Sequence, residues 1–488
     1  MDGKLVFGGA TIPYTELLER AHRAAQGFAT AGIGEGGTVA VMLKNHPVFV
    51  EAMLAARRLG AYWCPVNWHF KAEETGYILR DCGAGIFVVG DDLVDAVRGG
   101  VPPGVQVILL SQWDAWRDSH APFAGPQGRF GQSMAYTSGT TGRPKGVKRT
   151  LPADAQAQAE LSAAVWREVY GLQPGARALL SAPLYHSAPN AYALRSTISD
   201  AALWLEPKFD PERTLQLIHD ERLTHAYLVP TMFSRLLKLP DAVKRRYDVG
   251  SMRFVISMGS PCAPEVKRGM IDWWGPVIHE SYAASELGIV SFITAPDALR
   301  KPGSAGKAVG GTRIRIFDAL GNALPPGETG LIYARPPATP DFTYVNNDDA
   351  RRGLEREGLW TLGDMGYLDE EGYLFICDRA VDMVISGGVN IYPAEIEAAL
   401  VTMPGIVDCA VFGIPDAEFG EALAAAVQLE PGATADARSV QAWLRDRIAD
   451  YKVPRTVAFH VQLPREESGK IFKRRLKAPY WEQAGRSI

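Results

Sequence analysis

Apolar positions along the first 110 residues alternate between two periodicities. Residues 13–32 place apolar side chains at the three- and four-residue spacing of an amphipathic helix, and this segment ends at a glycine. Residues 37–43, 85–90 and 105–110 are short, mostly apolar runs rich in β-branched side chains. Such runs are typical of parallel strands that are buried on both faces. Helices that alternate with buried strands predict a wound α/β sheet.

The pattern changes after about residue 305. Residues 311–335 read as two strands around an Asn/Pro/Gly turn, which is more all-β in character and indicates a barrel-like part. Residues 383–416 read as strand, turn, helix and strand, and residues 439–477 as helix, strand, basic loop and helix. We therefore predict a large N-terminal domain of wound α/β sheets plus a distorted β-barrel, and a small C-terminal α+β domain. The predicted bounds are 1–378 for the first, 379–382 for a hinge and 383–488 for the second.

Composition excludes several classes of protein. A chain of 488 residues suggests about three domains, and two unequal domains fit equally well. A hydrophobic content of 47% with 22% charged residues is that of an ordinary globular protein with a sizeable core. The net charge of −4 argues against nucleic acid as a partner, because nucleic-acid binders usually carry a basic surplus.

Targeting and metal signals are missing from the sequence. No segment approaches the roughly 20 consecutive apolar residues of a transmembrane helix, and the first 20 residues lack the apolar run of a signal peptide. The five cysteines are scattered, odd in number and never in Cys-x-x-Cys spacing, which favours reduced thiols and a cytoplasmic location. The nine histidines show no metal-ligand spacing, so we expect no structural metal. The sequence is compatible with a homodimer.

A Gly-rich stretch, YTSGTTGRPKGVKRT at 136–150, has the composition of a phosphate-binding loop. It lacks the Gly-x-x-x-x-Gly-Lys-Ser/Thr pattern of the common nucleotide loop. It nevertheless combines open glycine backbone with three hydroxyl side chains and the ammonium group of Lys145, and such groups suit an anion. An ordinary surface loop has the same composition, so this stretch alone does not decide between the two.

Five further motifs follow in order. They are SMGSPCAP (257–264), ESYAASELG (280–288), LWTLGDMG (359–366), DRAVDMVISGGVNIYPAEIE (378–397) and LPREESGKIFKR (463–474). Together with the Gly-rich loop they resemble the acyl-adenylate-forming superfamily, which contains acyl-CoA synthetases, adenylation domains of peptide synthetases and luciferases. The resemblance extends from about Tyr14 to about Lys477. Within that superfamily the chain looks like a carboxylate:CoA ligase of the acyl-CoA synthetase branch.

The resemblance implies a reaction in two steps. A carboxylate attacks the α-phosphate of ATP to give acyl-AMP and pyrophosphate, and the acyl group then passes to CoA with loss of AMP. The implied cofactors are ATP, CoA and Mg²⁺. Because two anions meet in the first step, such catalysis depends on positioning and on charge neutralisation. The C-terminal domain would be mobile and rotate at the hinge between the steps.

The same resemblance assigns catalytic roles to three residues. Lys470 would reach the α-phosphate and the carboxylate during adenylation. Glu286 would bind Mg²⁺, and His186 would border and gate the acyl pocket. Taken singly, each has an ordinary alternative: Lys470 lies in a basic tail, Glu286 could be a solvated charge, and His186 could be a hydrogen-bonded core residue.

Nucleotide and CoA contacts are assigned in the same way. The Gly-rich loop would bind the β- and γ-phosphates, Tyr282 and the turn at 258–261 the adenine, and Asp364 both ribose hydroxyls. Arg379 would make a second ribose or phosphate contact. The full set is Thr137, Ser138, Gly139, Thr140, Thr141, Gly142, Lys145, Gly259, Ser260, Pro261, Ser281, Tyr282, Ala283, Ser285, Asp364, Arg379, and Gly387 with Gly388, which would line the pantetheine tunnel. Without the resemblance, the last two glycines would indicate a tight turn after a strand.

The acid-binding residues should be Tyr185, His186, Ala191, Thr231, Met232, Ser257 and Ala284. The segments that carry them (185–193, 229–233, 257–260 and 281–288) contain no Asp, Glu, Lys or Arg apart from Glu286. An unpaired charge in a dry pocket costs several kcal/mol, so we expect an acid that is uncharged beyond its carboxylate. A fatty, aromatic or alicyclic acid fits this pocket better than acetate.

Three rival functions are weighed against the CoA ligase. The first is a stand-alone adenylation enzyme that loads an acyl carrier protein or stops at acyl-AMP. The second is a luciferase-like oxygenase, for which no feature of the sequence is specific, and the third is a non-enzymatic nucleotide sensor, which would lose Lys470.

The chain departs from the resembling family at the hinge, where relatives usually have Asp or Lys and this chain has Val381. A β-branched residue has stiffer torsions, so the ease of rotation is in question.

Overall fold

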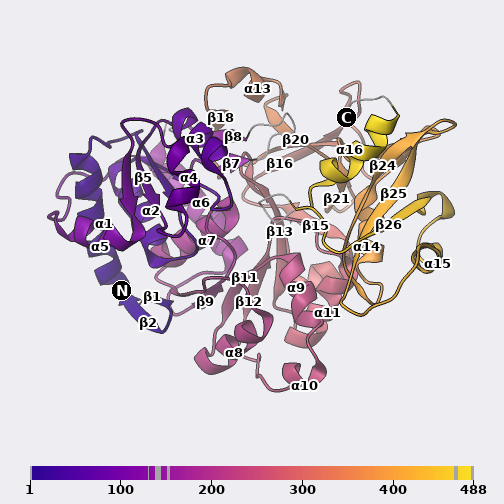
Figure 1. The fold of residues 1–488 in the computed structure, drawn as a ribbon, viewed down its shortest axis with the longest axis horizontal. Coiled ribbons are helices and arrows are strands. Elements are labelled where there is room, and N and C mark those ends of the chain that lie inside the picture. Colours follow the sequence, from indigo (N-terminus) through magenta and orange to yellow (C-terminus); the bar gives the residue numbers. More distant parts are fainter. Residues whose placement is uncertain (1–2, 130, 138–143, 151–153, 466–470, 485–488) are drawn as a thin grey trace.

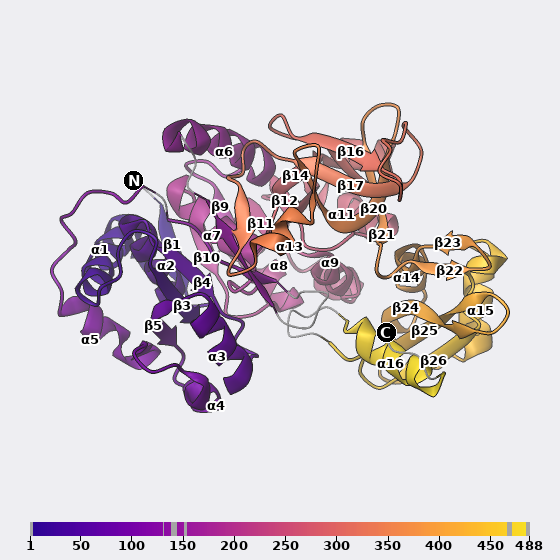
Figure 2. The ribbon, with the colours of Figure 1, turned by 90° about the horizontal axis from the view of Figure 1, so that it is seen from above.

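The computed structural model describes residues 3–129, 131–137, 144–150, 154–465 and 471–484. Figures 1 and 2 show two bodies, a large one that contains the N-terminus and a smaller one formed by the orange and yellow C-terminal segments. Within these described residues, the large body contains three sheets and the smaller body one. None of the described helices has both the length and the apolar character needed to cross a membrane.

The first sheet has four parallel strands in the order β4-β3-β5-β6. Helix α2 illustrates how the local sequence sets an element. The His46 side chain accepts a hydrogen bond from the amide of Val48, Pro47 occupies the first turn, and Gly60 ends the helix at a φ of 72°. The elements of this region are β3 (Thr38–Met42), β4 (Tyr62–Pro65), β5 (Ala84–Val89), β6 (Gln106–Leu109), α1 (Tyr14–Thr30), α2 (Pro47–Leu59), α3 (Ala72–Asp81), α4 (Val94–Val97) and α5 (Trp113–Asp118), with the 3₁₀ turns η1 (Arg98–Gly100) and η2 (Leu110–Gln112).

The second sheet contains fourteen strands of the described residues. Their order is β16-β17-β20-β21-β15-β14-β13-β12-β11-β9-β10-β1-β2, with β19 paired to β20. The run from β1 through β10, β9, β11 and β12 to β13 is parallel, and the strands after β13 pair antiparallel. The strands are β1 (Lys4–Phe7), β2 (Ala10–Pro13), β9 (Arg177–Leu180), β10 (Ala202–Leu205), β11 (His225–Leu228), β12 (Phe254–Ser257), β13 (Ile278–Ala284), β14 (Gly288–Ile293), β15 (Ser304–Ala308), β16 (Arg313–Phe317), β17 (Gly330–Arg335), β19 (Glu355–Arg356), β20 (Leu359–Leu368) and β21 (Leu374–Arg379).

Helices cover this long sheet, and a small third sheet lies beside it. The third sheet has the order β18-β8-β7 and includes both described ends of the Gly-rich loop. The remaining elements of the large body are α6 (Ala155–Tyr170), α7 (Ser187–Ile198), α8 (Pro211–Glu221), α9 (Pro230–Leu237), α10 (Asp241–Lys244), α11 (Pro264–Trp274), α12 (Ala295–Arg300), α13 (Asp348–Arg352), β7 (Tyr136–Thr137), β8 (Lys145–Arg149) and β18 (Phe342–Tyr344).

The wound α/β sheets and the small α+β lobe expected from the sequence are present, but the barrel-like part differs. In the part of the chain that the structure describes, strands β15, β16, β17, β20 and β21 do not close into a barrel. They pair antiparallel with β14 through β15 and so extend the long sheet. Pairing partners of this kind depend on tertiary contacts, which the alternation of residues within one strand does not specify.

The smaller body has its own sheet and its own core. Its strands run in the order β23-β22-β25-β24, with β26 parallel to β25. Ile396, Val411, Val427 and Leu444 are fully buried within it. The elements are β22 (Val384–Ser386), β23 (Val389–Ile391), β24 (Ile406–Asp416), β25 (Gly420–Leu429), β26 (Thr456–His460), α14 (Pro393–Leu400), α15 (Ala437–Arg445), η3 (Asp450–Lys452) and α16 (Lys473–Gln483).

Candidate active site

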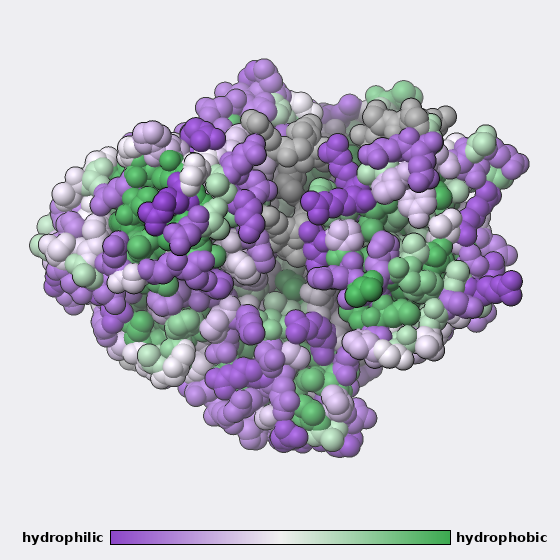
Figure 3. All heavy atoms as spheres, viewed as in Figure 1, coloured by the Kyte–Doolittle hydropathy of each residue, from purple (hydrophilic) through white to green (hydrophobic). Residues whose placement is uncertain are grey.

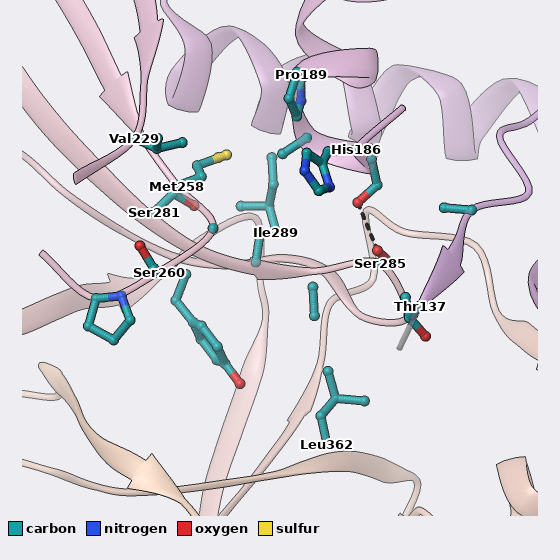
Figure 4. A pocket seen from close by; sticks show the side chains of 18 of the residues that line it. Thr137, His186, Pro189, Val229, Met258, Ser260, Ser281, Ser285, Ile289 and Leu362 are labelled. Atoms are coloured by element: carbon teal, nitrogen blue, oxygen red, sulfur yellow. Dashed lines mark hydrogen bonds between the residues drawn. The ribbon is translucent and has the colours of Figure 1, made fainter. Parts of the chain in front are cut away.

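Four loops of the large body meet at one edge of the long sheet. Strands β9, β11, β12 and β13 are parallel, so the segments that follow their carboxyl ends share that edge. These segments are 181–186, residue 229, 258–263 and 285–287. Figure 4 shows side chains from all four pointing into one space. Ligands of open α/β sheets bind outside the carboxyl ends of the strands, and this edge is therefore the candidate site.

A cleft of about 2920 Å³ opens in front of these loops. The smaller body supplies part of its lining, including Tyr392 and Glu395 near α14 and Arg465 and Ile471 near the C-terminus. Figure 3 shows the surface hollowed between the two bodies. Pockets for one small molecule typically have volumes of about 300–1,000 Å³, so this cleft has space for several reactants at once.

Glu286 is held at the base of the cleft. Its carboxylate accepts hydrogen bonds from Thr137 Oγ1 and from the hydroxyl of Tyr344, both at 3.1 Å, and its residue is 8% exposed. Burial and the charge of Glu286 raise the pKa of Tyr344, so that this hydroxyl stays protonated and donates. Arg149 fixes the loop by donating to the carbonyls of Ser285 and Glu286. Burial lowers the pKa of Arg149 to about 10, which leaves the guanidinium charged at neutral pH.

The serine beside Glu286 joins two elements of the site. Ser285 Oγ lies 2.7 Å from Ser187 Oγ at the first residue of α7, as Figure 4 shows. His186 immediately precedes that helix and lines the cleft. A helix N-terminus presents free amide groups and partial positive charge, which favour an anion. This corner of the cleft therefore suits a phosphate or a carboxylate.

Tyr282, Asp364 and Arg379 form the opposite side of the site. The Tyr282 hydroxyl donates to Asp364 Oδ2 at 2.5 Å, and Arg379 Nε lies 3.4 Å from Asp364 Oδ1. The pairing of β20 with β21 places Asp364 directly opposite Arg379. Burial, followed by the Asp364 charge, raises the pKa of Tyr282. The structure thus brings together the three residues expected around adenine and ribose.

Most of the predicted site residues line this one cleft. They are Thr137, Lys145, Tyr185, His186, Ala191, Thr231, Met232, Gly259, Ser260, Pro261, Ser281, Tyr282, Ala283, Ala284, Ser285, Glu286, Asp364 and Arg379. Lys145 also lies over the ring of Tyr344, with its ammonium 5.3 Å from the ring centre. Residues separated by more than 200 positions in the chain thus meet at one site.

Some predicted residues are not brought to the cleft. Ser257 is 1% exposed at the end of β12 and is not part of the cleft lining. Gly387 and Gly388 form the turn between β22 and β23, with φ of 57° and 81°, and they too lie away from the lining. Their backbone is the tight turn that glycine favours, and a tunnel role requires another orientation of the smaller body. Ser138, Gly139, Thr140, Thr141, Gly142 and Lys470 lie outside the described residues.

Comparison with known proteins identifies the family. The family model described as "AMP-binding enzyme" matches residues 3–339, and that of the "AMP-binding enzyme C-terminal domain" matches residues 395–470. The chain belongs to the AMP-binding enzyme family. It is 33% identical to a feruloyl-CoA synthase of Amycolatopsis sp, over 96% of this chain and 93% of that protein. It is 30% identical to a fatty acid–[acyl-carrier-protein] ligase of Streptomyces coeruleorubidus, over 98% and 94%.

A solved structure agrees with this fold over nearly the whole chain. ATP-bound MatB from Rhodopseudomonas palustris superimposes with a TM-score of 0.87 at 29% identity and covers 98% of this chain and 96% of that one. The placement of this AMP-binding enzyme in the acyl-CoA synthetase branch is confirmed, as is its nature as an AMP-forming acid–thiol ligase.

Sequence reasoning missed several residues of this AMP-binding enzyme that contact the site. Tyr344 and Arg149 hold Glu286 and its loop. Arg149 lies within the quoted Gly-rich stretch, so that motif gave a signal for it, whereas Ser187, which contacts Ser285, lies in the segment 185–193 that was expected to line the acid pocket. No motif marked Tyr344. Arg195, on the last turn of α7, also lines the cleft.

The predicted hinge has a simple local structure. The amides of Asp382 and Met383 donate to the carbonyl of Arg379, at 3.0 and 3.1 Å, which makes a compact turn after β21. Val381 lies in this turn and is 61% exposed. A β-branched side chain here therefore packs against little, and its effect on rotation stays a prediction.

Proposed function

We propose that this enzyme activates an apolar-bodied carboxylic acid with ATP and transfers the acyl group to CoA. The acid would be fatty, aromatic or alicyclic. One observation carries the proposal: the Ser187–Ser285 corner and Glu286 lie in the same cleft as the Tyr282–Asp364–Arg379 group. An acid and a nucleotide bound there would meet at the end of α7.

The residues divide the chemistry between them. Asp364 and Arg379 would hold the ribose, and Tyr282 the adenine. The N-terminus of α7 and the two serine hydroxyls would orient the carboxylate and the α-phosphate as their charges meet. Lys145 lies on the side of Glu286 and Tyr344, where the β- and γ-phosphates would extend. The result is acyl-AMP and pyrophosphate.

Glu286 is a suitable ligand for Mg²⁺. The described residues contain no cluster of three or more His, Cys, Asp or Glu side chains that could hold a metal without help. Mg²⁺ usually binds through one or two carboxylates together with substrate phosphates, and the single Glu286 carboxylate, surrounded by hydroxyl oxygens, fits that pattern. When bound, the ion would neutralise the charge of the departing pyrophosphate.

The second half-reaction would need the smaller body in another orientation. Residues 1–378 would form the ATP- and acyl-binding domain, 379–382 the hinge, and 383–488 the domain that carries Lys470. In the structure the residues flanking 466–470 line the cleft, whereas Gly387 and Gly388 do not. This arrangement fits adenylation, and rotation at 379–382 would bring the glycine turn to the cleft for thioester formation.

A carrier protein is the rival acceptor, because one relative is a fatty acid–[acyl-carrier-protein] ligase. The deciding experiment supplies ATP and a panel of acetate, octanoate, palmitate, benzoate, a cinnamate and phenylalanine, with CoA or with a phosphopantetheinylated carrier protein. We expect AMP release and an acyl-CoA product with an acid of apolar body. Acyl-AMP that is consumed only by the carrier protein would favour the rival, and preference for acetate or phenylalanine would overturn the pocket assignment.

A further inference from the structure

Helix α7 carries the lining of the cleft well beyond the predicted acid-binding residues. The side chains on its cleft face include Ser187, Ala188, Ala191, Leu194, Arg195 and Ile198. At 1.5 Å per residue, Arg195 lies eight positions after Ser187 and therefore about 12 Å further along the helix. The reacting corner and Arg195 therefore mark two ends of one wall, and the residues between them are small or apolar.

Two other helices complete the far end of this wall. Trp166 and Tyr170, one turn apart on α6, line the same cleft, and the Arg195 guanidinium lies over the Trp166 ring. Arg57, in the last turn of α2, also lines it. Figure 2 shows α6 beside α7. The far end thus combines two aromatic rings with two arginines.

Neither arginine has an acidic partner among the described residues. No carboxylate lies within ion-pair distance of Arg57 or Arg195, and Arg195 Nε is buried without a hydrogen-bond acceptor. Burial lowers the pKa of both side chains, and the positive charge of Arg57 lowers that of Arg195 further. Arg57 and Arg195 thus place two mutually repelling cations at the end of the cleft, and the described residues supply no anion beside them.

Two other arginines of the large body, Arg117 and Arg149, are buried in a different way. Arg117 forms ion pairs with Glu51, Asp114 and Asp118. Arg149 donates to three backbone carbonyls. Arg117 and Arg149 thus receive acceptors from the protein itself, whereas Arg195 lines the cleft and its Nε is buried without an acceptor.

We propose that Arg195, assisted by Arg57, binds a second carboxylate of the acid substrate, so that the substrate is a dicarboxylic acid with an apolar spacer. The inference rests on the proposed function and names its substrate class. A guanidinium matches a carboxylate with two parallel hydrogen bonds, and an anion between two arginines removes their repulsion. Ala188, Ala191 and Leu194 would contact the spacer.

The length of this wall determines how long the spacer between the two carboxylates must be. A short diacid such as malonate does not extend over about 12 Å of helix, whereas a diacid of medium length does. A simple fatty acid of the same length would leave both arginines without an anion. This revises the expectation of an acid uncharged beyond its reacting carboxylate. That expectation considered residues 185–193, and the charged side chain stands two positions further along the same helix.

The test compares acids of equal length with the complete enzyme, ATP, Mg²⁺ and CoA. Initial rates give kcat/KM for suberate against octanoate and for sebacate against decanoate. We expect the wild-type enzyme to prefer each diacid at least tenfold. Arg195→Met should remove or reverse this preference, mainly through KM for the diacid, and Arg195→Lys should retain part of it. Arg167→Met is the matched control, because Arg167 is exposed on α6 outside the cleft lining and should leave the preference unchanged.

A binding measurement separates specificity from folding. The wild-type melting temperature should rise more with suberate than with octanoate, and Arg195→Met should lose this difference while keeping its melting temperature without ligand. Wild-type preference for the monoacids, unchanged by Arg195→Met, would overturn the second-carboxylate site and leave the proposed ligase intact. Failure to form AMP with any acid, mono or di, would instead overturn the proposed function.

Discussion

The two bodies of the enzyme hold their parts of the site in different ways. In the large body, the site loops follow buried parallel strands, and Glu286 is fixed by Thr137, Tyr344 and, through its loop, Arg149. The smaller body has a separate core. Its polar contacts with the large body include Lys238, immediately after α9, which donates to the Ile406 carbonyl at 2.7 Å and pairs with Glu430 at 3.1 Å.

This difference indicates how the two bodies contribute to the cleft. One wall of the cleft is preorganised by a sheet that cannot move without exposing its core. The other wall is joined to the first by the turn after β21 and by partly exposed polar contacts, and exposed ion pairs contribute only about 0–1 kcal/mol each. Changes in the smaller body should therefore separate the two half-reactions. The predictions below begin with the largest expected effect.

Lys470→Ala should impair adenylation about 10²–10³-fold, because the lysine would neutralise charge only when the carboxylate meets the α-phosphate. Transfer from supplied acyl-AMP to CoA should stay within a few-fold of the wild-type rate. Pyrophosphate release and thioester formation are measured separately. Equal losses in both would point to a folding defect or to a wrong assignment of the lysine.

Gly388→Trp should have the opposite effect, leaving pyrophosphate release and blocking thioester formation. The turn at Gly388 has a φ of 81°, so any side chain is strained there, but nothing lies within 4 Å of the position of an added Cβ. Gly388→Ala is therefore the matched control, since it carries the strain without the bulk. If the soluble tryptophan variant kept full CoA ligation, the glycine turn would not pass the pantetheine.

Lys238→Met should have the smallest effect. Removing its contacts with Ile406 and Glu430 should destabilise the observed orientation and change the ratio of the two half-reaction rates by at most about fivefold. Lys244→Met serves as a control, because Lys244 pairs with Asp241 within α10 rather than with the smaller body. A loss of both half-reactions to the same extent would show that Lys238 supports the large body instead.

The sequence was most informative where local pattern and structure coincide. The apolar runs predicted β3, β5 and β6, and the ordered motifs predicted the loops that line the cleft. Both signals are contained within short stretches of chain. The alternation of residues in β15–β17 could not distinguish a barrel from an extended sheet, because strand partners are chosen by tertiary packing.

The site residues that the sequence did not reveal also depend on tertiary packing. Tyr344 contacts Glu286 across 58 positions of the chain, and no motif at residue 344 records that contact. Arg195 belongs to the cleft because α7 continues for two turns beyond Ala188 with the same face turned inward. Its lack of a carboxylate partner results from the packing of α2, α6 and α7, which the sequence of α7 alone does not specify.

The most direct test of the ligase reaction follows the oxygen atoms of the acid. The enzyme is supplied with a carboxylic acid labelled with ¹⁸O in both carboxylate oxygens, together with ATP, Mg²⁺ and CoA, and the AMP is weighed by mass spectrometry. Attack of the carboxylate on the α-phosphate predicts one ¹⁸O atom in each AMP released with the thioester. Unlabelled AMP, or label in inorganic phosphate with ADP as the nucleotide product, would contradict an acyl-adenylate intermediate.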